Sequence, residues 1–277
     1  MDLPIGVFDS GLGGLSVVKQ IIDSMPNEDI IYFADNAHVP YGERPLEQIR
    51  DFAAEITSFL IEKGAKAVVM ACNMSSAVAL ESARMHFPDV PIIGVIEPGV
   101  LAALKSSSGD KIGVLATSGT VKSMAYYNMV KKLSSNYEVF QQACPKFVPI
   151  VESGNADSED AEACACMYVE PLLKNDCKTI ILGCTHYPYL KKAIISACNG
   201  EDIKIIDPAE ETAKMLYDVL KSGNMQSSKN NANHIFYTSG ETKSFSELGS
   251  IFLGKEINAF PVVWGVDLGK TLSDVVV

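Results

Sequence analysis

Short, almost wholly apolar runs recur along the chain, and glycine or small polar residues follow each of them. Runs of four or five residues match the length of strands buried on both faces better than that of helices. These runs are Ile5–Phe8, Ile30–Phe33, Ala67–Met70, Ile92–Ile96, Ile112–Leu115, Thr179–Leu182 and Ile203–Ile206. Amphipathic stretches of helical period, such as Leu46–Lys63, lie between several of them. This alternation predicts an α/β fold with mainly parallel sheets flanked by helices.

The chain also carries a weak internal repeat. Three landmarks recur in the same order: an Ile-Gly-Val segment at 5–11 and 112–118, a cysteine after an apolar run at 72 and 184, and an Ile-acid-Pro triplet at 96–98 and 206–208. Cys72 lies 62 residues after Ser10, and Cys184 lies 67 residues after Thr117. We therefore expect two similar α/β units.

The segment after residue 208 reads differently from the repeat. It contains a helix-like Ala209–Lys221, a polar loop Ser222–Asn233, a strand-like His234–Thr238 and a helix-like Lys243–Leu253. Because this segment is too small to stand alone, we expect it to pack on the first unit. The predicted domains are residues 1–97 with 209–277, and residues 98–208.

Composition and charge narrow the class of protein. The 277 residues are 47% apolar and 21% charged, as in a folded protein. A formal charge of −11 argues against binding to nucleic acid, and no apolar run approaches the roughly 18–20 residues of a membrane span. The acidic N-terminus does not resemble a signal peptide, and seven cysteines without a framework spacing indicate reduced thiols. These features predict a cytoplasmic protein.

Polar residues follow four of the predicted strands, at the edge where ligands gather in parallel α/β sheets. They are Asp9-Ser10, Cys72-Asn73, Thr117 and Cys184-Thr185-His186. We expect a helix to follow each one, so that its free N–H groups favour anions and lower a thiol pKa from about 8.5. Two thiols in equivalent places suggest two bases acting on one substrate from opposite sides, as inversion of a stereocentre requires.

Other candidates have plainer interpretations. Gly11-Leu12-Gly13-Gly14 lacks the ending of a phosphate loop and predicts a tight turn that lets the backbone approach a ligand. Asp9 fits a helix N-cap or a site residue, His186 a structural cap or an acid–base group, and Glu152 ends an apolar stretch in a loop. The remaining cysteines are expected to be small buried hydrophobes, with no metal site: Cys144, Cys164, Cys166, Cys177 and Cys198.

Together these segments resemble the cofactor-independent glutamate racemases. The motifs that carry the resemblance run in the family's order across residues 5–210. They are Val7-Phe8-Asp9-Ser10-Gly11-Leu12-Gly13-Gly14-Leu15-Ser16-Val17, Ala34-Asp35-Asn36-Ala37-His38-Val39-Pro40-Tyr41-Gly42, Ala71-Cys72-Asn73, Gly94-Val95-Ile96-Glu97-Pro98-Gly99, Ala116-Thr117-Ser118-Gly119-Thr120-Val121, Cys144-Pro145 through Glu152, and Leu182-Gly183-Cys184-Thr185-His186-Tyr187-Pro188.

The resemblance implies two pseudo-symmetric α/β domains with the active site between them, no cofactor and no metal. It implies that Cys72 takes the α-proton from D-glutamate and Cys184 from L-glutamate, with Asp9, Glu152 and His186 assisting the thiols. The residues it assigns to substrate binding are Asp9, Ser10, Pro40, Tyr41, Gly42, Cys72, Asn73, Met74, Thr117, Cys184, Thr185 and His186. It further implies that the product feeds peptidoglycan synthesis, and it is compatible with assembly as a homodimer.

The chain departs from the family in two places. Met74 stands where a threonine usually follows Cys-Asn and contacts substrate, and Asn36 replaces a commoner threonine. A thioether accepts hydrogen bonds weakly and donates none. A racemase of another acidic amino acid, aspartate above all, therefore stays open. So do a lyase or hydrolase in which one cysteine acts, and a non-catalytic relative that binds an amino acid or a protein.

Overall fold

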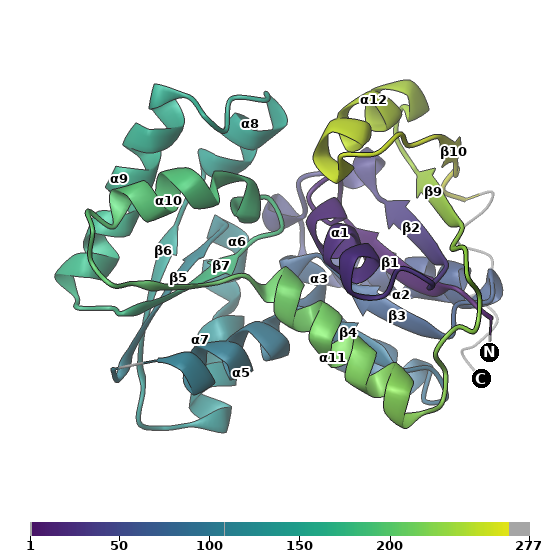
Figure 1. The fold of residues 1–277 in the computed structure, drawn as a ribbon, viewed down its shortest axis with the longest axis horizontal. Helices are drawn as coiled ribbons and strands as arrows, with labels where there is room; N and C mark the ends of the chain where they lie inside the picture. The colour runs from purple at the N-terminus through teal and green to yellow at the C-terminus, as the bar shows by residue number, and fades with distance from the viewer. Residues whose placement is uncertain (1, 108, 266–277) are drawn as a thin grey trace. The chain divides into compact units, whose positions relative to one another are not determined.

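The computed structural model describes residues 2–107 and 109–265, and the chain divides into two compact units. Unit 1 comprises Met1–Val95 and Thr212–Val277, and unit 2 comprises Ile96–Glu211. The sequence had placed these boundaries at 97/98 and 208/209, two or three residues away. The second boundary falls inside one helix, α11 (Pro208–Ser222), which Figure 1 draws in green.

Unit 1 contains a sheet of parallel strands in the order β10-β9-β2-β1-β3-β4. Its strands are β1 (Ile5–Asp9), β2 (Ile30–Ala34), β3 (Ala67–Met70), β4 (Ile92–Gly94), β9 (His234–Thr238) and β10 (Ala259–Pro261). Residue Ile30 of β2 is in register with His234 of β9, and Ala34 with Thr238. The segment after unit 2 thus extends the sheet that the N-terminal residues begin.

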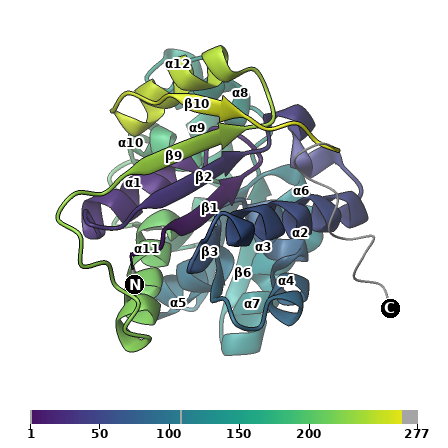
Figure 2. The ribbon, with the colours of Figure 1, turned by 90° about the vertical axis from the view of Figure 1, so that its right-hand side faces the viewer.

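Helices cover both faces of this sheet, as Figure 2 shows. They are α1 (Leu15–Ser24), α2 (Leu46–Glu62), α3 (Asn73–Val78), α4 (Leu80–His86) and α12 (Thr242–Leu253), with the short 3-10 helices η1 (Asn36–His38) and η2 (Tyr41–Glu43). Phe33 of β2 packs edge-on against Phe59 of α2, whereas Tyr32 stacks on Phe245 of α12. Adjacent residues of one buried strand therefore supply the cores on the two faces of the sheet.

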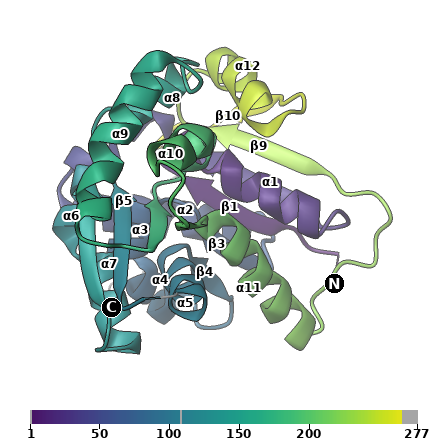
Figure 3. The ribbon, with the colours of Figure 1, turned by 60° about the vertical axis from the view of Figure 1, so that its left-hand side comes forward.

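Unit 2 contains a smaller parallel sheet in the order β6-β5-β7-β8. Its elements are α5 (Ile96–Ser106), β5 (Lys111–Ala116), α6 (Ser118–Ser123), α7 (Ala125–Leu133), β6 (Glu138–Ala143), α8 (Phe147–Glu152), α9 (Glu159–Lys174), β7 (Thr179–Gly183), η3 (Tyr187–Leu190), α10 (Lys191–Ala197) and β8 (Lys204–Ile206). Helix α9 lies so close to β5 that a Cβ on Gly113 would be 2.9 Å from Cδ1 of Leu172. Figure 3 turns α9 and α10 toward the viewer.

The two sheets share a four-stranded pattern. The order β2-β1-β3-β4 in unit 1 matches β6-β5-β7-β8 in unit 2, and strands β9 and β10 are additions to unit 1. The repeat seen in the sequence is therefore a repeat of topology. The predicted fold class, α/β with two mainly parallel sheets flanked by helices, is confirmed.

The elements depart from expectation at several points. Strand β4 ends at Gly94, and Ile96 begins α5 instead of ending the strand. Strands β6 and β10 were not predicted, because no residue of either strand is buried. The sequence was also wrong about Cys166, which is exposed on α9 while Cys164 is buried. Two residues apart on a helix, these side chains point in different directions.

Candidate active site

In unit 1, two of the predicted site residues lie at the carboxyl end of β1. Asp9 is the last residue of β1, and Ser10 comes directly after it. The Asp9 side chain is 1% exposed, and its Oδ2 accepts hydrogen bonds from the backbone N–H of Gly11 (3.3 Å) and of Gly14 (2.9 Å). Asp9 therefore satisfies the backbone of the glycine turn that leads into α1, but it is not the N-cap of that helix, which is Gly14.

The glycine turn is tight because the backbone closes on Asp9. A Cβ on Gly14 would lie 2.5 Å from the Cβ of Asp9 and 2.6 Å from the hydroxyl oxygen of Tyr32. The same hydroxyl donates to the carbonyl of Gly11 at 2.6 Å. A side chain at Gly14 has no room, so the turn predicted from the sequence is required by its contacts with Asp9 and Tyr32.

Cys72 caps α3 two residues after β3 and is 6% exposed. Its Sγ lies 4.0 Å from Oγ of Ser10, which brings together residues from the ends of β1 and β3. Burial, and then the neighbouring Asp9 carboxylate, raise the pKa of the Cys72 thiol to about 12, although the backbone N–H groups of Ser75 and Met74 act to lower it. The expected lowering of the pKa is therefore wrong here, because loss of water outweighs the helix N-terminus.

Met74 occupies an apolar cluster beside Cys72. It is buried with Tyr41, Ile49 and Cys72, and Phe52 packs against the same cluster. Tyr41 lies in η2, directly after the cis Val39–Pro40 bond, with Pro40 exposed and Gly42 partly buried. The structure thus brings the Pro40–Gly42 loop to the residues around Cys72.

Asp35 was not among the predicted site residues, although it lies within one of the quoted motifs. It follows β2 directly, and its Oδ2 accepts a hydrogen bond from the Tyr41 hydroxyl at 2.6 Å. The signal that could have identified it is its position, because an acidic residue at the carboxyl end of a predicted strand also marked Asp9.

In unit 2, Cys184, His186 and Glu152 form a chain of polar contacts. Cys184 follows β7 and is 8% exposed, and its Sγ lies 3.8 Å from Nδ1 of His186. The other ring nitrogen, Nε2, lies 3.2 Å from Oε1 of Glu152. A carboxylate in this position can stabilise the charged form of an imidazole.

One local expectation for unit 2 is wrong: Glu152 does not lie in a loop, since it is the last residue of α8. The next element after Cys184 is a helix as expected, although it is the short 3-10 helix η3, which begins at Tyr187 after a turn at Thr185 and His186 and leads into α10 at Lys191. At Thr117 a helix also follows as expected: the Thr117 hydroxyl caps α6 by accepting from the backbone N–H of Thr120.

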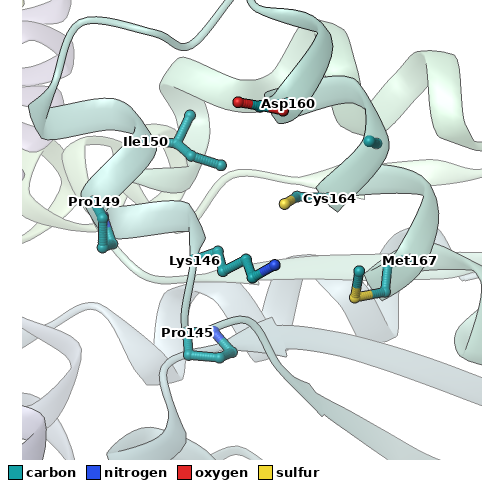
Figure 4. Close-up of a pocket in the computed structure, with 8 residues that line it drawn as sticks. Pro145, Lys146, Pro149, Ile150, Asp160, Cys164 and Met167 are labelled. Carbon is teal, nitrogen blue, oxygen red and sulfur yellow. The ribbon is translucent and has the colours of Figure 1, made fainter.

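A pocket of about 490 Å³ lies on unit 2, and Figure 4 shows its lining. The pocket is formed by residues of α8 and α9 with the segment before α8, and Lys146, Asp160 and Met167 project around it. None of the predicted site residues lines it. The polar chain that ends at Glu152 is therefore distinct from this pocket.

Residues 2–107 and 109–265 contain no group of three or more His, Cys, Asp or Glu side chains placed to hold a metal ion. Within the same residues, no helix combines the length and the apolar character that crossing a bilayer requires.

The chain is similar to known racemases over nearly its whole length. It is 41% identical to a glutamate racemase from Geobacter metallireducens over 91% of this chain and 93% of the relative. A solved glutamate racemase isoform from Bacillus anthracis matches with a TM-score of 0.91 and 38% identity, covering 95% of this chain and 98% of the other. A glutamate racemase from Francisella tularensis, solved with D-glutamate, matches with a TM-score of 0.87 and 37% identity, covering 95% and 97%.

The family model described as Asp/Glu/Hydantoin racemase matches residues 5–216. This range begins at β1 and ends within α11, so that it includes Asp9, Cys72, Glu152 and Cys184. The strand-end thiols and their polar partners thus lie inside the region that the model matches, and the chain belongs to the Asp/Glu/Hydantoin racemase family.

Proposed function

We propose that this chain is a glutamate racemase that interconverts L- and D-glutamate with two thiols, Cys72 and Cys184, as its acid–base pair. The observation that carries this proposal is the equivalent position of the two cysteines, each at the carboxyl end of the third strand of its repeat. The glutamate racemases at about 41% identity supply the substrate class. Each unit would then contribute one thiol.

In the L-to-D direction, Cys184 acts as the base. Its proton passes to His186, and the resulting thiolate removes the α-proton of L-glutamate while Glu152 stabilises the imidazolium. The Cys72 thiol, which its raised pKa keeps protonated, then delivers a proton to the other face of the α-carbon. The C–H bond broken on one face is replaced by a new C–H bond on the opposite face, and no electrons are lost or gained.

In the D-to-L direction, Cys72 must give up its proton first. The negative charge of the Asp9 carboxylate opposes formation of the Cys72 thiolate. If Asp9 itself accepts the thiol proton, this charge is neutralised and the opposition is removed, so we propose Asp9 as the acceptor. The two thiols therefore receive different help: Cys72 has a carboxylate and Cys184 has an imidazole backed by a carboxylate. We propose Asp9, Glu152 and His186 as the catalytic assistants on this basis.

The intermediate of either reaction is a carbanion, which is unstable unless donors stabilise the adjacent carboxylate. We propose that hydroxyl, amide and backbone N–H groups beside the thiols supply these donors, and that backbone carbonyls such as that of Pro40 help to hold the amino acid as acceptors. The residues assigned to this task are Ser10, Pro40, Tyr41, Gly42, Asn73, Thr117 and Thr185. No cofactor is needed in this scheme, because the two thiols and these donors account for each proton transfer.

One observation favours a second candidate substrate. Met74 is buried in the apolar cluster with Tyr41 and Ile49, at a position where the family usually has a hydroxyl. A buried thioether gives no donor to a distal carboxylate. Aspartate, whose distal carboxylate lies one methylene closer to the α-carbon, is therefore the alternative substrate of the same two-thiol reaction.

The setting of the reaction is part of the same proposal. D-glutamate is a building block of peptidoglycan, so we propose that this chain supplies it for cell-wall synthesis. We also propose that it acts in the cytoplasm, since reduced thiols are required, and that two chains assemble as a homodimer. Size-exclusion chromatography with light scattering tests the last point.

Incubation in D₂O tests the reaction. The protein is mixed with L- or D-glutamate, or with L- or D-aspartate, and loss of the α-proton signal is followed by NMR while circular dichroism follows inversion. We expect glutamate of either hand to exchange and invert. The double variant with Cys72→Ala and Cys184→Ala should lose both activities.

A matched control comes from the strand that carries Cys184. Cys177 is a fully buried thiol just before the amino end of β7, opposite the end at which Cys184 lies. Cys177→Ala should keep racemase activity, whereas either Cys72→Ala or Cys184→Ala alone should abolish inversion. If the folded wild type exchanges the α-proton of neither acid, racemisation of these substrates is wrong. Faster turnover of aspartate would keep the mechanism and replace the substrate.

A further inference from the structure

Asp35 is a fully buried carboxylate that binds the loop carrying Pro40, Tyr41 and Gly42. It is 0% exposed, and its backbone N–H donates to the carbonyl of Asp9 at 3.0 Å, which fixes it beside the end of β1. Within the loop, the Tyr41 hydroxyl donates to Oδ2 at 2.6 Å, and Nδ1 of His38 lies 3.0 Å from both carboxylate oxygens. Because an ionised carboxylate only accepts, Nδ1 of His38 carries the proton.

Two more donors reach Asp35 from residues near 240 and 264. The Ser239 hydroxyl donates to Oδ1 at 2.7 Å, and the indole N–H of Trp264 donates to the same oxygen at 2.9 Å. Ser239 in turn accepts from the backbone N–H of Ala37 at 3.0 Å, so it links the carboxylate to the start of the loop. Four side chains from two distant parts of the chain thus converge on one carboxylate.

Ring packing holds the same group together. The His38 ring stacks on Phe52 with centroids 4.1 Å apart and an interplanar angle of 18°. Trp264 packs edge-on against both rings, at 4.8 Å from His38 and 5.1 Å from Phe52. These contacts leave the His38 and Trp264 donors little freedom to turn toward other acceptors.

This arrangement requires a carboxylate. The Tyr41 hydroxyl and the Trp264 indole each have one proton to donate, and the buried Tyr41 hydroxyl has no water as an alternative acceptor. An amide at position 35 would be nearly the same size, but its NH₂ group would face one of the donors. The hydrogen bond from the Tyr41 hydroxyl to Asp35 matters most, since it fixes the direction of the Tyr41 ring and of the loop around it.

We propose that Asp35 is a positioning residue for the substrate loop: it acts through the Tyr41 hydroxyl to fix Pro40, Tyr41 and Gly42, with Ser239 and Trp264 completing its hydrogen bonds. The amino acid itself is bound by the loop and not by Asp35. This role rests on the proposed function, in which Tyr41 and Gly42 hold the substrate.

The test compares the single variants Asp35→Asn and Tyr41→Phe with the double variant that carries both changes. If Asp35 acts through the Tyr41 hydroxyl, each single variant raises the KM for glutamate about tenfold or more, while kcat changes far less. The double variant then has nearly the same KM as either single variant, because both changes remove one interaction. If the KM of the double variant instead rises by the product of the two single increases, the residues act independently and the positioning role of Asp35 is wrong.

A matched control lies at the other end of the same strand. Asp29, just before β2, accepts from the Lys229 ammonium and from the backbone N–H of Asn233 at 2.7 Å, and so also ties the strand to a distant segment. Asp29→Asn should lower stability but leave KM unchanged. If Asp35→Asn merely loses folded protein and keeps the wild-type KM, as expected of Asp29→Asn, then Asp35 is structural and the positioning role is wrong.

Amide hydrogen exchange separates this role from the proposed reaction. Asp35→Asn should raise exchange in residues 36–44, while Asp29→Asn should raise it in residues 229–233. This readout needs no turnover. Faster exchange at 36–44 in a protein that racemises neither acid would refute the reaction and keep the loop-fixing role, whereas unchanged exchange there in an active enzyme would refute the role alone.

Discussion

The Cys72 thiol should resist alkylation near neutral pH. Burial and the Asp9 carboxylate raise the pKa of Cys72 from 9.0 to about 12. Only the thiolate is nucleophilic, and its fraction falls tenfold for each unit that the pKa lies above the pH. At pH 8 that fraction is about 10⁻⁴, against about 0.1 for a pKa of 9.0. At pH 8 Cys72 should therefore hold about a thousandfold less thiolate than a thiol of pKa 9.0, and iodoacetamide should alkylate it more slowly even before any effect of limited access.

Peptide mass spectrometry measures this rate for each cysteine separately. The exposed Cys166 is the internal reference, and far-UV circular dichroism checks that the protein stays folded between pH 7 and 11. The logarithm of the Cys72 rate should rise by one unit per pH unit across the whole range, without levelling off below pH 11. Limited access alone would lower the rate at every pH without moving the point at which it levels off.

Replacing the neighbouring carboxylate tests the cause of the shift. Asp9→Asn removes the charge and keeps an acceptor oxygen for the backbone N–H groups of Gly11 and Gly14. Burial, the larger cause, remains, so the pKa of Cys72 should fall without reaching 9.0. Alkylation of Cys72 at pH 8 should become faster than in the wild type. A wild-type rate that levels off near pH 9, or an Asp9→Asn rate equal to the wild-type rate, would refute this reasoning.

Three further changes probe other parts of the molecule. Glu152→Gln removes the charge beside His186, so kcat/KM should fall about tenfold. The fall should be equal in the two directions, because the enantiomers have equal free energies and the equilibrium constant is one. If kcat/KM measured by polarimetry is unchanged, Glu152 is not part of the site. Gly14→Ala should lower the free energy of unfolding in urea by about 1–3 kcal/mol, because its Cβ would overlap neighbours at 2.5 and 2.6 Å, whereas Gly109→Ala, with no atom within 4 Å, should change little. Met74→Thr should cost about 2 kcal/mol or more of stability and raise the glutamate-to-aspartate ratio of kcat/KM; an unchanged ratio would show that Met74 does not select the substrate.

The buried core of the fold could be predicted from the sequence. Strand Ala67–Met70 and strand His234–Thr238 have the predicted bounds, because continuous apolar or β-branched runs mark strands buried within a sheet. Strand β6 was not predicted because Glu138, Gln141 and Gln142 interrupt its apolar positions and none of its residues is buried. The edge strands β4 and β8 were predicted, since their isoleucines form short apolar runs.

The site was predictable to the extent that it follows strand ends. Asp9, Cys72 and Cys184 lie there, as the alternating pattern indicated. The pKa of Cys72 could not be read from the sequence, because it depends on how completely packing removes water from the thiol. The four donors on Asp35 were equally hidden, since two of them lie more than 200 residues away in sequence.

The split of unit 1 along the sequence has a consequence for its synthesis. Unit 2 is continuous in the sequence, but strands β9 and β10 of unit 1 are synthesised only after the whole of unit 2. Ser239 and Trp264 follow Asp35 by 204 and 229 residues, which at ribosomal speeds of about 5–20 residues per second is a delay of roughly 10–45 s. Throughout that interval the outer edge of β2 is unpaired and Asp35 lacks half of its donors, so the nascent chain presents an open strand edge of the kind that chaperones must protect.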